Sequence, residues 1–209
     1  MWYNKKTLRK LLIKGGKTMF KFFAFISRMK YIKRWSLMRS VKEENIMEHT
    51  QQVAIIAHAL ALIHNKNYGG NADIQKTVLL AQYHEVGEVI TGDLPTPIKY
   101  FNPEIKSAYK DLEVGACEKL LAMLPDNLKD EYRQYVLPDT QTVEYKIVKY
   151  ADRISAYLKC VEELKAGNSE FKKAGKSIEK ELKTCGFDAV GYYMKEFVPA
   201  YELTLDELD

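Results

Sequence analysis

Cysteine is scarce in this sequence, which has three: Cys117, Cys160 and Cys185. Their number is odd and no two form a C-x-x-C pair, so the sequence indicates neither a disulfide framework nor a thiolate zinc site. Proteins without disulfides are typical of reducing compartments. We therefore expect this protein to be cytoplasmic.

Long apolar runs are also missing. No segment reaches the roughly 18 uninterrupted apolar residues that a membrane-spanning helix needs. In the first eighteen residues the longest apolar stretch, Leu11 to Ile13, is too short for a signal peptide. The 209 residues are nevertheless 46% hydrophobic, which is enough to bury the core of one globular domain. The sequence predicts no membrane partner.

Acidic residues are absent from the first 42 positions, which hold thirteen Lys or Arg, whereas the rest of the chain has 19 bases and 28 acids. This asymmetry can mark a nucleic-acid-binding arm or a basic extension without a catalytic role. The run Lys14-Gly15-Gly16 can be encoded by a purine-rich ribosome-binding sequence just upstream of Met19. One hypothesis is therefore that residues 1–18 are translated leader and residues 19–209 the working domain. That domain would have 26 bases and 28 acids, so we expect no nucleic-acid partner.

Apolar residues after Met19 recur at helical spacing, and almost no stretch alternates as a strand would. Between Asn45 and His64, one buried stripe is formed by Val53, Ile56, Leu60 and Ile63. Further helices are predicted from Asn71, from Asn102-Pro103 to about Leu124, from Pro125, from about Thr140 to Lys165, between Asn168 and Gly186, and up to Pro199. The expected fold class is all-α, a single bundle of six or seven helices.

One segment with a distinct character is predicted to be non-helical. It runs from Thr91 to Pro97 and contains two prolines, Pro95 and Pro97, which stiffen the chain and should bar a helix there. Rigid loops beside helix ends are common places for functional sites.

Histidines are few, and two of the four have features that suggest a site. His49 shares the stripe of Val53 and should point inward. His84 is followed directly by Glu85, and Glu88 lies one turn further on. An unpaired buried carboxylate is costly, so such groups are normally paired or bound to a metal such as zinc, manganese, iron or cobalt. The alternative for His49 is a hydrogen-bonded core histidine, and the alternative for the group around His84 is a solvated cluster at a helix end. His58 and His64 have no acidic neighbour within one helical turn and are interpreted as structural or surface residues.

Asp152 lies inside a predicted helix, between Val148 and Ala156, where aspartate is unfavourable. Arg153 beside it points about 100° away and is not an obvious partner. A salt bridge to a base on another helix would account for Asp152 alone. A mononuclear metal site would account for it together with the histidines and Glu85.

The combination of His49, the pair His84-Glu85 and Asp152 resembles the HD-domain phosphohydrolases, whose ligands are a His, an adjacent His-Asp pair and a later Asp. More narrowly, the sequence is similar to the bacterial HD-domain 5′-deoxynucleotidases from about Phe20 to the C-terminus. The resemblance is carried by FFAFISRMKYIKRWSLMRSV, ENIMEHTQQVAIIAHALA, YHEVGEVITGDLPTPIKYFNPEI, ADRISAYLKCVEELKAGN and FVPAYELTLDEL. It implies cytoplasmic homodimers that hydrolyse deoxynucleoside 5′-monophosphates, with one divalent metal ion per subunit, such as cobalt, manganese or zinc.

The resemblance also implies roles for individual residues. Metal ligands would be His49, His84, Glu85 and Asp152, of which His49, Glu85 and Asp152 would also contact substrate. Arg34 and Trp35 match an Arg-Trp pair that contacts substrate, with the arginine orienting the phosphate. The nucleoside loop corresponds to Asp93, Leu94, Pro95 and Thr96, and Glu88 matches an acid important for catalysis.

Glu85 departs from the family pattern, which has aspartate there. Glutamate keeps the charge but reaches about 1.5 Å further, in a site where roughly 0.5 Å of placement matters. One alternative is therefore a degenerate member that binds nucleotides or nucleic acid without efficient turnover. A protease-like H-E-x-x-H motif is disfavoured because Glu88 stands where the second histidine is needed.

Overall fold

The computed structural model of the chain describes residues 13–14, 17–99 and 101–209. Within this part, β1 (Ile13–Lys14) pairs antiparallel with β2 (Lys17–Thr18). Most of the basic extension, including Gly15 and Gly16, lies outside the described residues. The hypothesis of a translated leader therefore stays a prediction.

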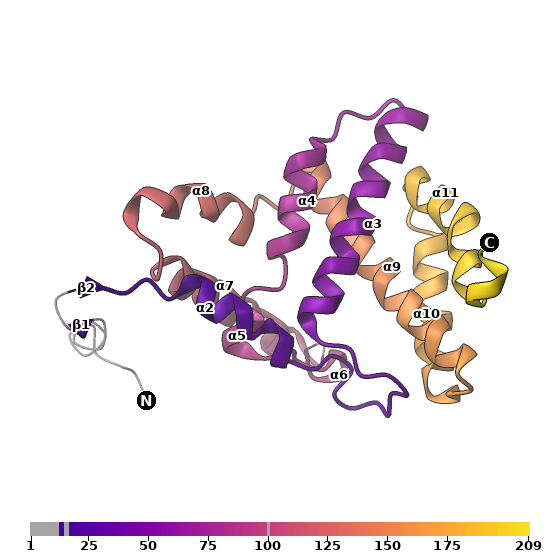
Figure 1. Cartoon of the computed structure of the whole chain (residues 1–209), viewed down its shortest axis with the longest axis horizontal. Helices are drawn as coiled ribbons and strands as arrows, with labels where there is room; N and C mark the ends of the chain where they lie inside the picture. The colour runs from indigo at the N-terminus through magenta and orange to yellow at the C-terminus, as the bar shows by residue number, and fades with distance from the viewer. Residues whose placement is uncertain (1–12, 15–16, 100) are drawn as a thin grey trace.

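The rest of the described chain is helical (Figure 1). Its elements are α2 (Phe22–Ile26), η1 (Ser27–Tyr31), α3 (Ile46–Asn67), α4 (Ile74–Tyr83), α5 (Glu88–Thr91), α6 (Thr96–Lys99), α7 (Pro103–Leu121), α8 (Asp126–Val136), α9 (Val143–Lys165), η2 (Ser169–Phe171), α10 (Lys172–Lys183), α11 (Asp188–Glu196), η3 (Val198–Glu202) and η4 (Leu205–Glu207). Among them, seven α-helices have nine or more residues. The expected all-α fold is confirmed.

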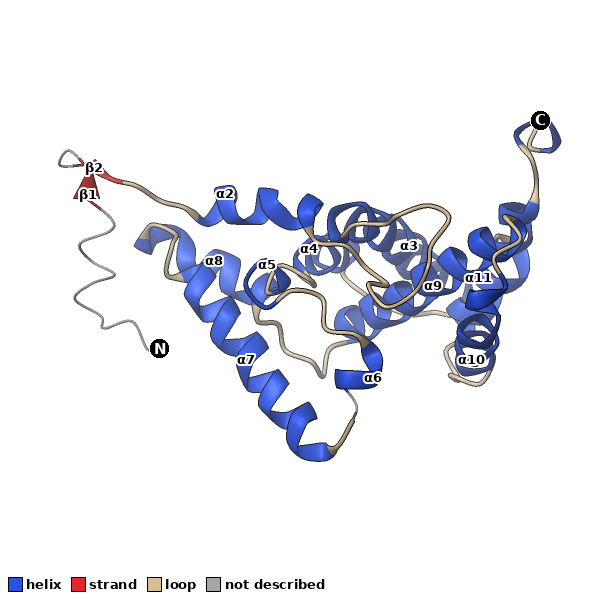
Figure 2. Ribbon diagram, turned by 90° about the horizontal axis from the view of Figure 1, so that it is seen from below, coloured by secondary structure: helices blue, strands red, loops and turns tan. Residues whose placement is uncertain are grey.

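The main core lies where α3 packs against α4, α9 and α11, with α10 on the far side of α9 (Figures 1 and 2). The stripe predicted on α3 is buried in this core, and it meets Leu80 and Ala81 of α4 and Ile147, Ala151 and Ile154 of α9. Full burial of each large aliphatic side chain contributes roughly 1.5–3 kcal/mol to folding. These contacts fix α3, α4 and α9 relative to one another.

A second core joins α2, η1, α7 and α8, and its largest fully buried side chains include Phe22 and Met29. The two cores meet along α3 and at the end of α4. On α3, Ile46 belongs to the second core and Val53 to the first. Ala81, near the end of α4, belongs to the first core, and Val86, just after that helix, belongs to the second. His49 and His84 therefore lie at the junction between the two cores.

Several predicted helix boundaries are correct. Asn102 accepts a hydrogen bond from Ile105 N and caps α7, with Pro103 in the first turn, and Pro125 precedes α8. The α4 cap was placed wrongly at Asn71: the helix begins two residues later, because the carboxylate of Asp73 accepts from Lys76 N. Similarly, α9 begins after Thr142, whose hydroxyl accepts from Tyr145 N.

The expectation that Thr91 to Pro97 contains no helix is wrong at both ends. The helix α5 ends at Thr91 and the short helix α6 begins at Thr96. Pro97 is tolerated in α6 because a first-turn residue needs no N–H for an intrahelical bond. The chain between them turns at Gly92, whose φ of 75° is in the left-handed region that glycine adopts readily.

In the described part of the chain, none of the helices has the length and apolarity to cross a membrane.

Candidate metal and substrate site

One turn of α9 provides two groups that face His49. The fully buried imidazole has its Nδ1 atom 3.0 Å from Ser155 Oγ and its Nε2 atom 3.1 Å from Asp152 Oδ1. His49 itself lies in the first turn of α3, where Asn45 caps the helix by accepting from Met47 N. Close packing of α3 on α9 therefore brings together two residues that are more than 100 positions apart.

Hydrogen bonding fixes which imidazole nitrogens carry protons. Ser155 Oγ donates to Gln52 Oε1 at 2.6 Å, so its hydrogen is used and it accepts from His49 Nδ1–H. At His84, the Nδ1 atom lies 2.7 Å from the carbonyl oxygen of Ala81 and must be the donor. In the neutral form of each ring, Nε2 is then the nitrogen with a bare lone pair, which is the form that binds metals.

The two bare nitrogens converge with two carboxylates. Ligand atoms from His49, His84, Glu85 and Asp152 all lie within 4.8 Å of one another. Both Nε2 atoms are buried, and among the described residues they have no hydrogen-bond donor. Lone pairs facing carboxylate oxygens repel unless a cation lies between them, so the donor set fits a divalent metal ion.

Electrostatics favour the ligand forms of His84 and Asp152. Burial lowers the pKa of His84 despite the nearby carboxylates, which keeps the imidazole neutral. Burial would raise the pKa of Asp152, but the nearby positive charge of Lys149 opposes this shift, and that pKa lies well below its ordinary value.

Lys149 is a site residue that the sequence reasoning missed. Its Nζ atom lies 3.3 Å from Asp152 Oδ2, and the carboxylate raises the pKa of Lys149. The available signal was its spacing, three residues before Asp152 on the same helix face. Asp152 thus has a lysine partner on its own helix, whereas the neighbouring Arg153 pairs with Glu181 of α10.

Glu85 and Glu88 form a carboxyl pair beside the ligands. Glu85 Oε1 lies 3.4 Å from His84 Nε2, and its carboxylate is hydrogen-bonded to the Glu88 carboxyl. Burial and the charge of Glu85 raise the pKa of Glu88, so the Glu88 carboxyl holds the proton of the pair. The structure therefore brings Glu88 next to a predicted ligand.

Arg34 faces the same carboxylates from the segment before α3. Its Nη1 atom lies 2.7 Å from Glu44 Oε2, and its backbone N–H donates to Glu44 O at 2.9 Å. Burial lowers the pKa of the guanidinium, but Glu44, Asp152, Glu85 and Asp93 together raise it above its ordinary value. Arg34 is thus a permanent cation whose charge interacts with the carboxylates of the ligand cluster.

Trp35 lies beside Arg34 in an unusual backbone conformation. Among non-glycine residues in the described chain, it alone has a positive φ, at 57°. Its ring packs edge-on against Phe171, with 5.3 Å between ring centroids, and the Arg34 guanidinium lies 5.9 Å from its centroid. The indole N–H is buried and has no partner among the described residues, so it is available to donate to a bound molecule.

The predicted nucleoside loop follows α5. Asp93, Leu94 and Pro95 are half-buried and Thr96 is exposed at the start of α6. Burial raises the pKa of Asp93, and the charge of Arg34 opposes this shift. Asp93 is therefore near the arginine. Helix α7 supports the loop, because the Tyr109 hydroxyl donates to Gly92 O at 3.3 Å.

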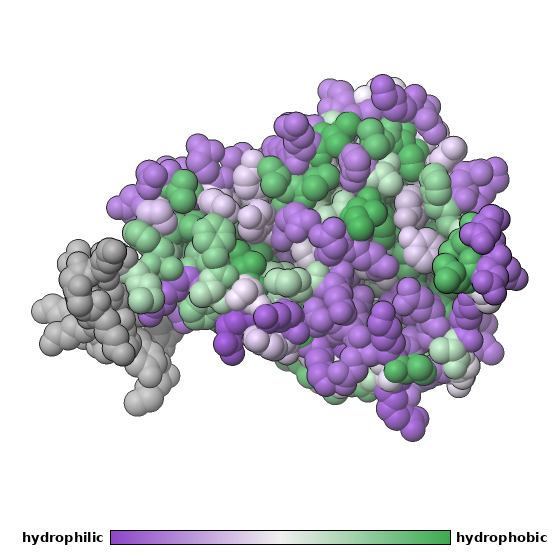
Figure 3. Space-filling model, in the orientation of Figure 1, coloured by the Kyte–Doolittle hydropathy of each residue, from purple (hydrophilic) through white to green (hydrophobic). Residues whose placement is uncertain are grey.

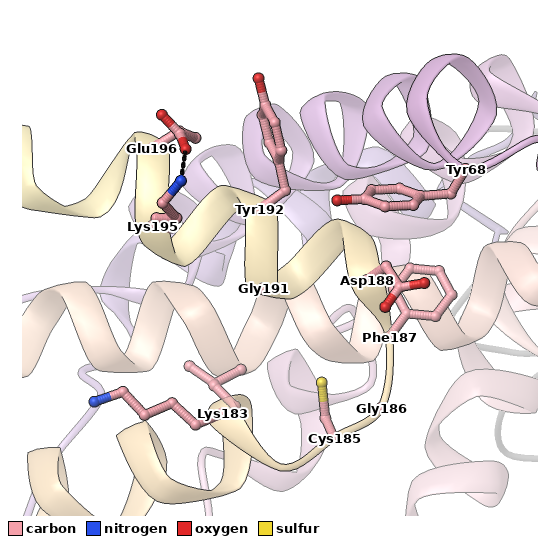
Figure 4. A pocket seen from close by; sticks show the side chains of 11 residues that line it. Tyr68, Lys183, Cys185, Gly186, Phe187, Asp188, Gly191, Tyr192, Lys195 and Glu196 are labelled. Carbon is pink, nitrogen blue, oxygen red and sulfur yellow. Dashed lines mark ion pairs between the residues drawn. The ribbon is translucent and has the colours of Figure 1, made fainter.

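The remaining histidines lie outside this cluster, as the sequence suggested. His58 is exposed, and His64 stacks on Phe187 with 4.9 Å between ring centroids. Phe187 also lines a separate pocket with Tyr68 and Tyr192 (Figure 4). This pocket contains none of the predicted site residues.

Known proteins share both the sequence and the fold. Residues 21–201 match the family described as 5′-deoxynucleotidase YfbR-like. A 5′-deoxynucleotidase of Vibrio cholerae is 52% identical over 90% of this chain and 97% of its own length. Another, from Photorhabdus laumondii, is 52% identical over 90% of this chain and 95% of its own length.

Solved structures support the fold. An HD-domain phosphohydrolase from Listeria innocua superposes with a TM-score of 0.76 over 87% of this chain and 88% of its own, at 21% identity. The HD phosphohydrolase of cyanophage S-2L, solved with dA and one catalytic Zn²⁺, covers 84% of this chain and 95% of its own, with a TM-score of 0.56 and 18% identity. The chain therefore belongs to the YfbR-like 5′-deoxynucleotidases, the enzyme family that the sequence blocks resembled.

Proposed function

We propose that residues 19–209 form a metal-dependent phosphomonoesterase domain that cleaves deoxyribonucleoside 5′-monophosphates to deoxyribonucleosides and phosphate. The observation that carries this proposal is the convergence of two bare imidazole nitrogens and two carboxylates beside the buried cation of Arg34. Four ligands of this kind leave coordination positions free for water and a phosphate oxygen. The activity named for the relatives fits this chemistry.

The ligands in this proposal are His49, His84, Glu85 and Asp152, holding one divalent ion such as cobalt, manganese or zinc per subunit. When bound, the ion would lower the pKa of a water and withdraw charge from phosphorus. Glu88 carries the proton of the carboxyl pair, so its proposed role is to orient the attacking water through a hydrogen bond.

Substrate binding is assigned to the two segments next to this cluster. Arg34 offers a planar fork of N–H donors to the phosphate oxygens, and its pairing with Glu44 aims that fork. The face of Trp35 would form a wall of the nucleoside pocket, with Asp93, Leu94, Pro95 and Thr96 on the other side. A pocket that fits the deoxyribose closely would leave a ribose 2′-hydroxyl clashing or unpaired, which disfavours ribonucleotides.

The assembly and location follow from the family resemblance: a homodimer in the cytoplasm. Exposed apolar side chains are compatible with a partner copy. Ile55 and Leu62 are seven residues apart on one face of α3, and Leu79 of α4 is also exposed. Figure 3 shows apolar surface over this part of the molecule. Sedimentation analysis would test the proposal, and a monomer at micromolar concentration would contradict it.

The decisive experiment measures phosphate release from a panel of deoxyribonucleoside and ribonucleoside 5′-monophosphates. Each substrate is tested with manganese, cobalt, zinc or a chelator. We expect release from the deoxyribonucleotides that the chelator abolishes and an added metal restores. Release that survives complete metal removal would refute the metal-dependent mechanism. Nucleotide binding without release would instead support the degenerate alternative.

A further inference from the structure

A buried carboxylate at the end of α9 holds the loop that follows Trp35. Glu163 is 2% exposed, and each of its oxygens accepts two hydrogen bonds. Oε2 accepts from Val41 N at 2.8 Å and from the Asn168 amide at 2.8 Å. Oε1 accepts from Lys42 N at 3.2 Å and from the Lys159 ammonium.

Lys159 completes this arrangement one turn earlier on α9. Its buried ammonium donates to Glu163 and also to the carbonyl oxygen of Lys42, and it lies 5.7 Å from the centroid of the Phe171 ring. A buried ion pair often adds little net stability, because desolvation offsets the attraction. Its clearest effect here is geometric, since both charges bind the backbone of residues 41–42.

The same region of the chain holds the other end of the loop. The ring of Phe171, fully buried beneath Lys159, supports the edge of Trp35. Glu170 accepts from the backbone and the guanidinium of Arg39, and the Asn168 amide donates to Arg39 O. The loop from Trp35 to Lys42 is thus attached at several points to residues 159–171.

The backbone of Trp35 needs such support. A bulky residue at a φ of 57° is in a conformation that costs on the order of 1–3 kcal/mol, and it persists only where the surroundings over-determine it. Trp35 is followed by a turn in which Met38 N donates to Trp35 O at 2.8 Å. A loop free to move at residues 39–42 would let this turn relax.

We propose that the Lys159–Glu163 pair is a positioning device for substrate binding, which fixes the loop from Trp35 to Lys42 and thereby holds Trp35 and Arg34 in place. Neither charged residue touches the metal cluster or the proposed substrate. The inference rests on the proposed function only in assigning Arg34 and Trp35 to the substrate. The position of Trp35 itself can be measured independently.

The test compares Glu163→Gln with Glu162→Gln, a change at the exposed neighbour on the same helix. Both are made in a Trp2→Phe background, where Trp35 is the remaining tryptophan and its emission reports on that ring alone. In Glu163→Gln we expect KM for dAMP to rise at least about five-fold, a red-shifted emission, and manganese affinity within about two-fold of the parent. Glu162→Gln should match the parent in all three. Parental KM and emission in Glu163→Gln would overturn the proposal.

A milder variant covers the case in which Glu163→Gln does not fold. Asn168→Ala removes the amide donors to Glu163 and to Arg39 O while the ion pair remains. It should move KM and emission in the same direction by a smaller amount, and no change in a folded Asn168→Ala protein would count against the proposal. If the parent chain releases no phosphate, the proposed function fails, whereas the emission shift still decides whether the pair positions Trp35.

Discussion

Asp152 and Ser155 lie three residues apart on α9 and contact opposite nitrogens of the same imidazole. Asp152 Oδ1 is 3.1 Å from His49 Nε2, and Ser155 Oγ is 3.0 Å from His49 Nδ1. One helical turn therefore supplies a proposed metal ligand, Asp152, and the hydroxyl that accepts from Nδ1 of another proposed ligand, His49. Such outer contacts orient metal-bound histidines and tune their affinity.

Ser155→Ala should weaken metal binding by about 10- to 100-fold, because His49 loses the acceptor that holds its proton on Nδ1. Competition with a chromogenic chelator measures this directly. Ser169→Ala, at an exposed serine of η2, is the matched control. Equal manganese affinity in Ser155→Ala and the parent would show that the hydroxyl does not set the tautomer.

His49→Ala and Asp152→Ala should abolish metal binding and phosphate release, since each removes one of four converging ligands. The helical content, measured by circular dichroism, should stay largely intact because the cores around α3 and α9 keep their apolar contacts. Metal content and turnover are measured on the same preparation. A metal-free His49→Ala protein that released phosphate from dAMP at the parental rate would refute the site assignment.

Glu85→Asp tests the departure from the family pattern. Aspartate restores the shorter side chain, so we predict that phosphate release is retained or increased. Glu48→Asp, at an exposed acid in the first turn of α3, serves as the control for the same change of length. A complete loss of activity in Glu85→Asp would mean that the site is built around glutamate, with the end of α4 shifted to accommodate it.

Arg34→Lys should lower turnover by about 100-fold while manganese affinity changes by less than about two-fold, because lysine keeps the charge but lacks the planar fork. Steady-state kinetics and a metal titration separate the two effects. Arg28→Lys, a change at an exposed arginine of η1, is expected to leave both unchanged. Full turnover in Arg34→Lys would remove Arg34 from phosphate orientation.

The helical spacing of apolar residues was sufficient to predict the helices. It also predicted the inward direction of His49, because His49 shares the face of α3 that carries the buried apolar stripe. The ligand set followed from unfavourable residues on apolar faces together with the family resemblance. These signals depend on local spacing, which the sequence displays directly.

Contacts between residues far apart in the chain could not be predicted from local spacing. Glu163 pairs with backbone groups more than 120 positions earlier, and its only local signal is the i,i+4 spacing to Lys159. Backbone amides carry no sequence signature, so nothing marked Val41 or Lys42 as partners. The two prolines were taken to exclude a helix, although the first turn of a helix tolerates proline, and for this reason the start of α6 was not predicted.

Glu163 should also make stability depend on pH. Burial would raise its pKa, but the hydrogen bonds from Lys159, Val41, Asn168 and Lys42 lower it from 4.5 to about 2. A carboxylate with a depressed pKa in the folded state stabilises the protein fully above the unfolded value, and that contribution is lost as the pH falls from about 4.5 toward 2. Glu163→Gln has no such charge to lose. The difference in unfolding free energy between the parent and Glu163→Gln, measured in urea, should therefore narrow by about 1 kcal/mol between about pH 6.5 and 3.5. The difference in unfolding free energy between the parent and Glu162→Gln should change much less over the same range. A difference between the parent and Glu163→Gln that stays constant would mean that folding does not lower the pKa of the Glu163 carboxylate.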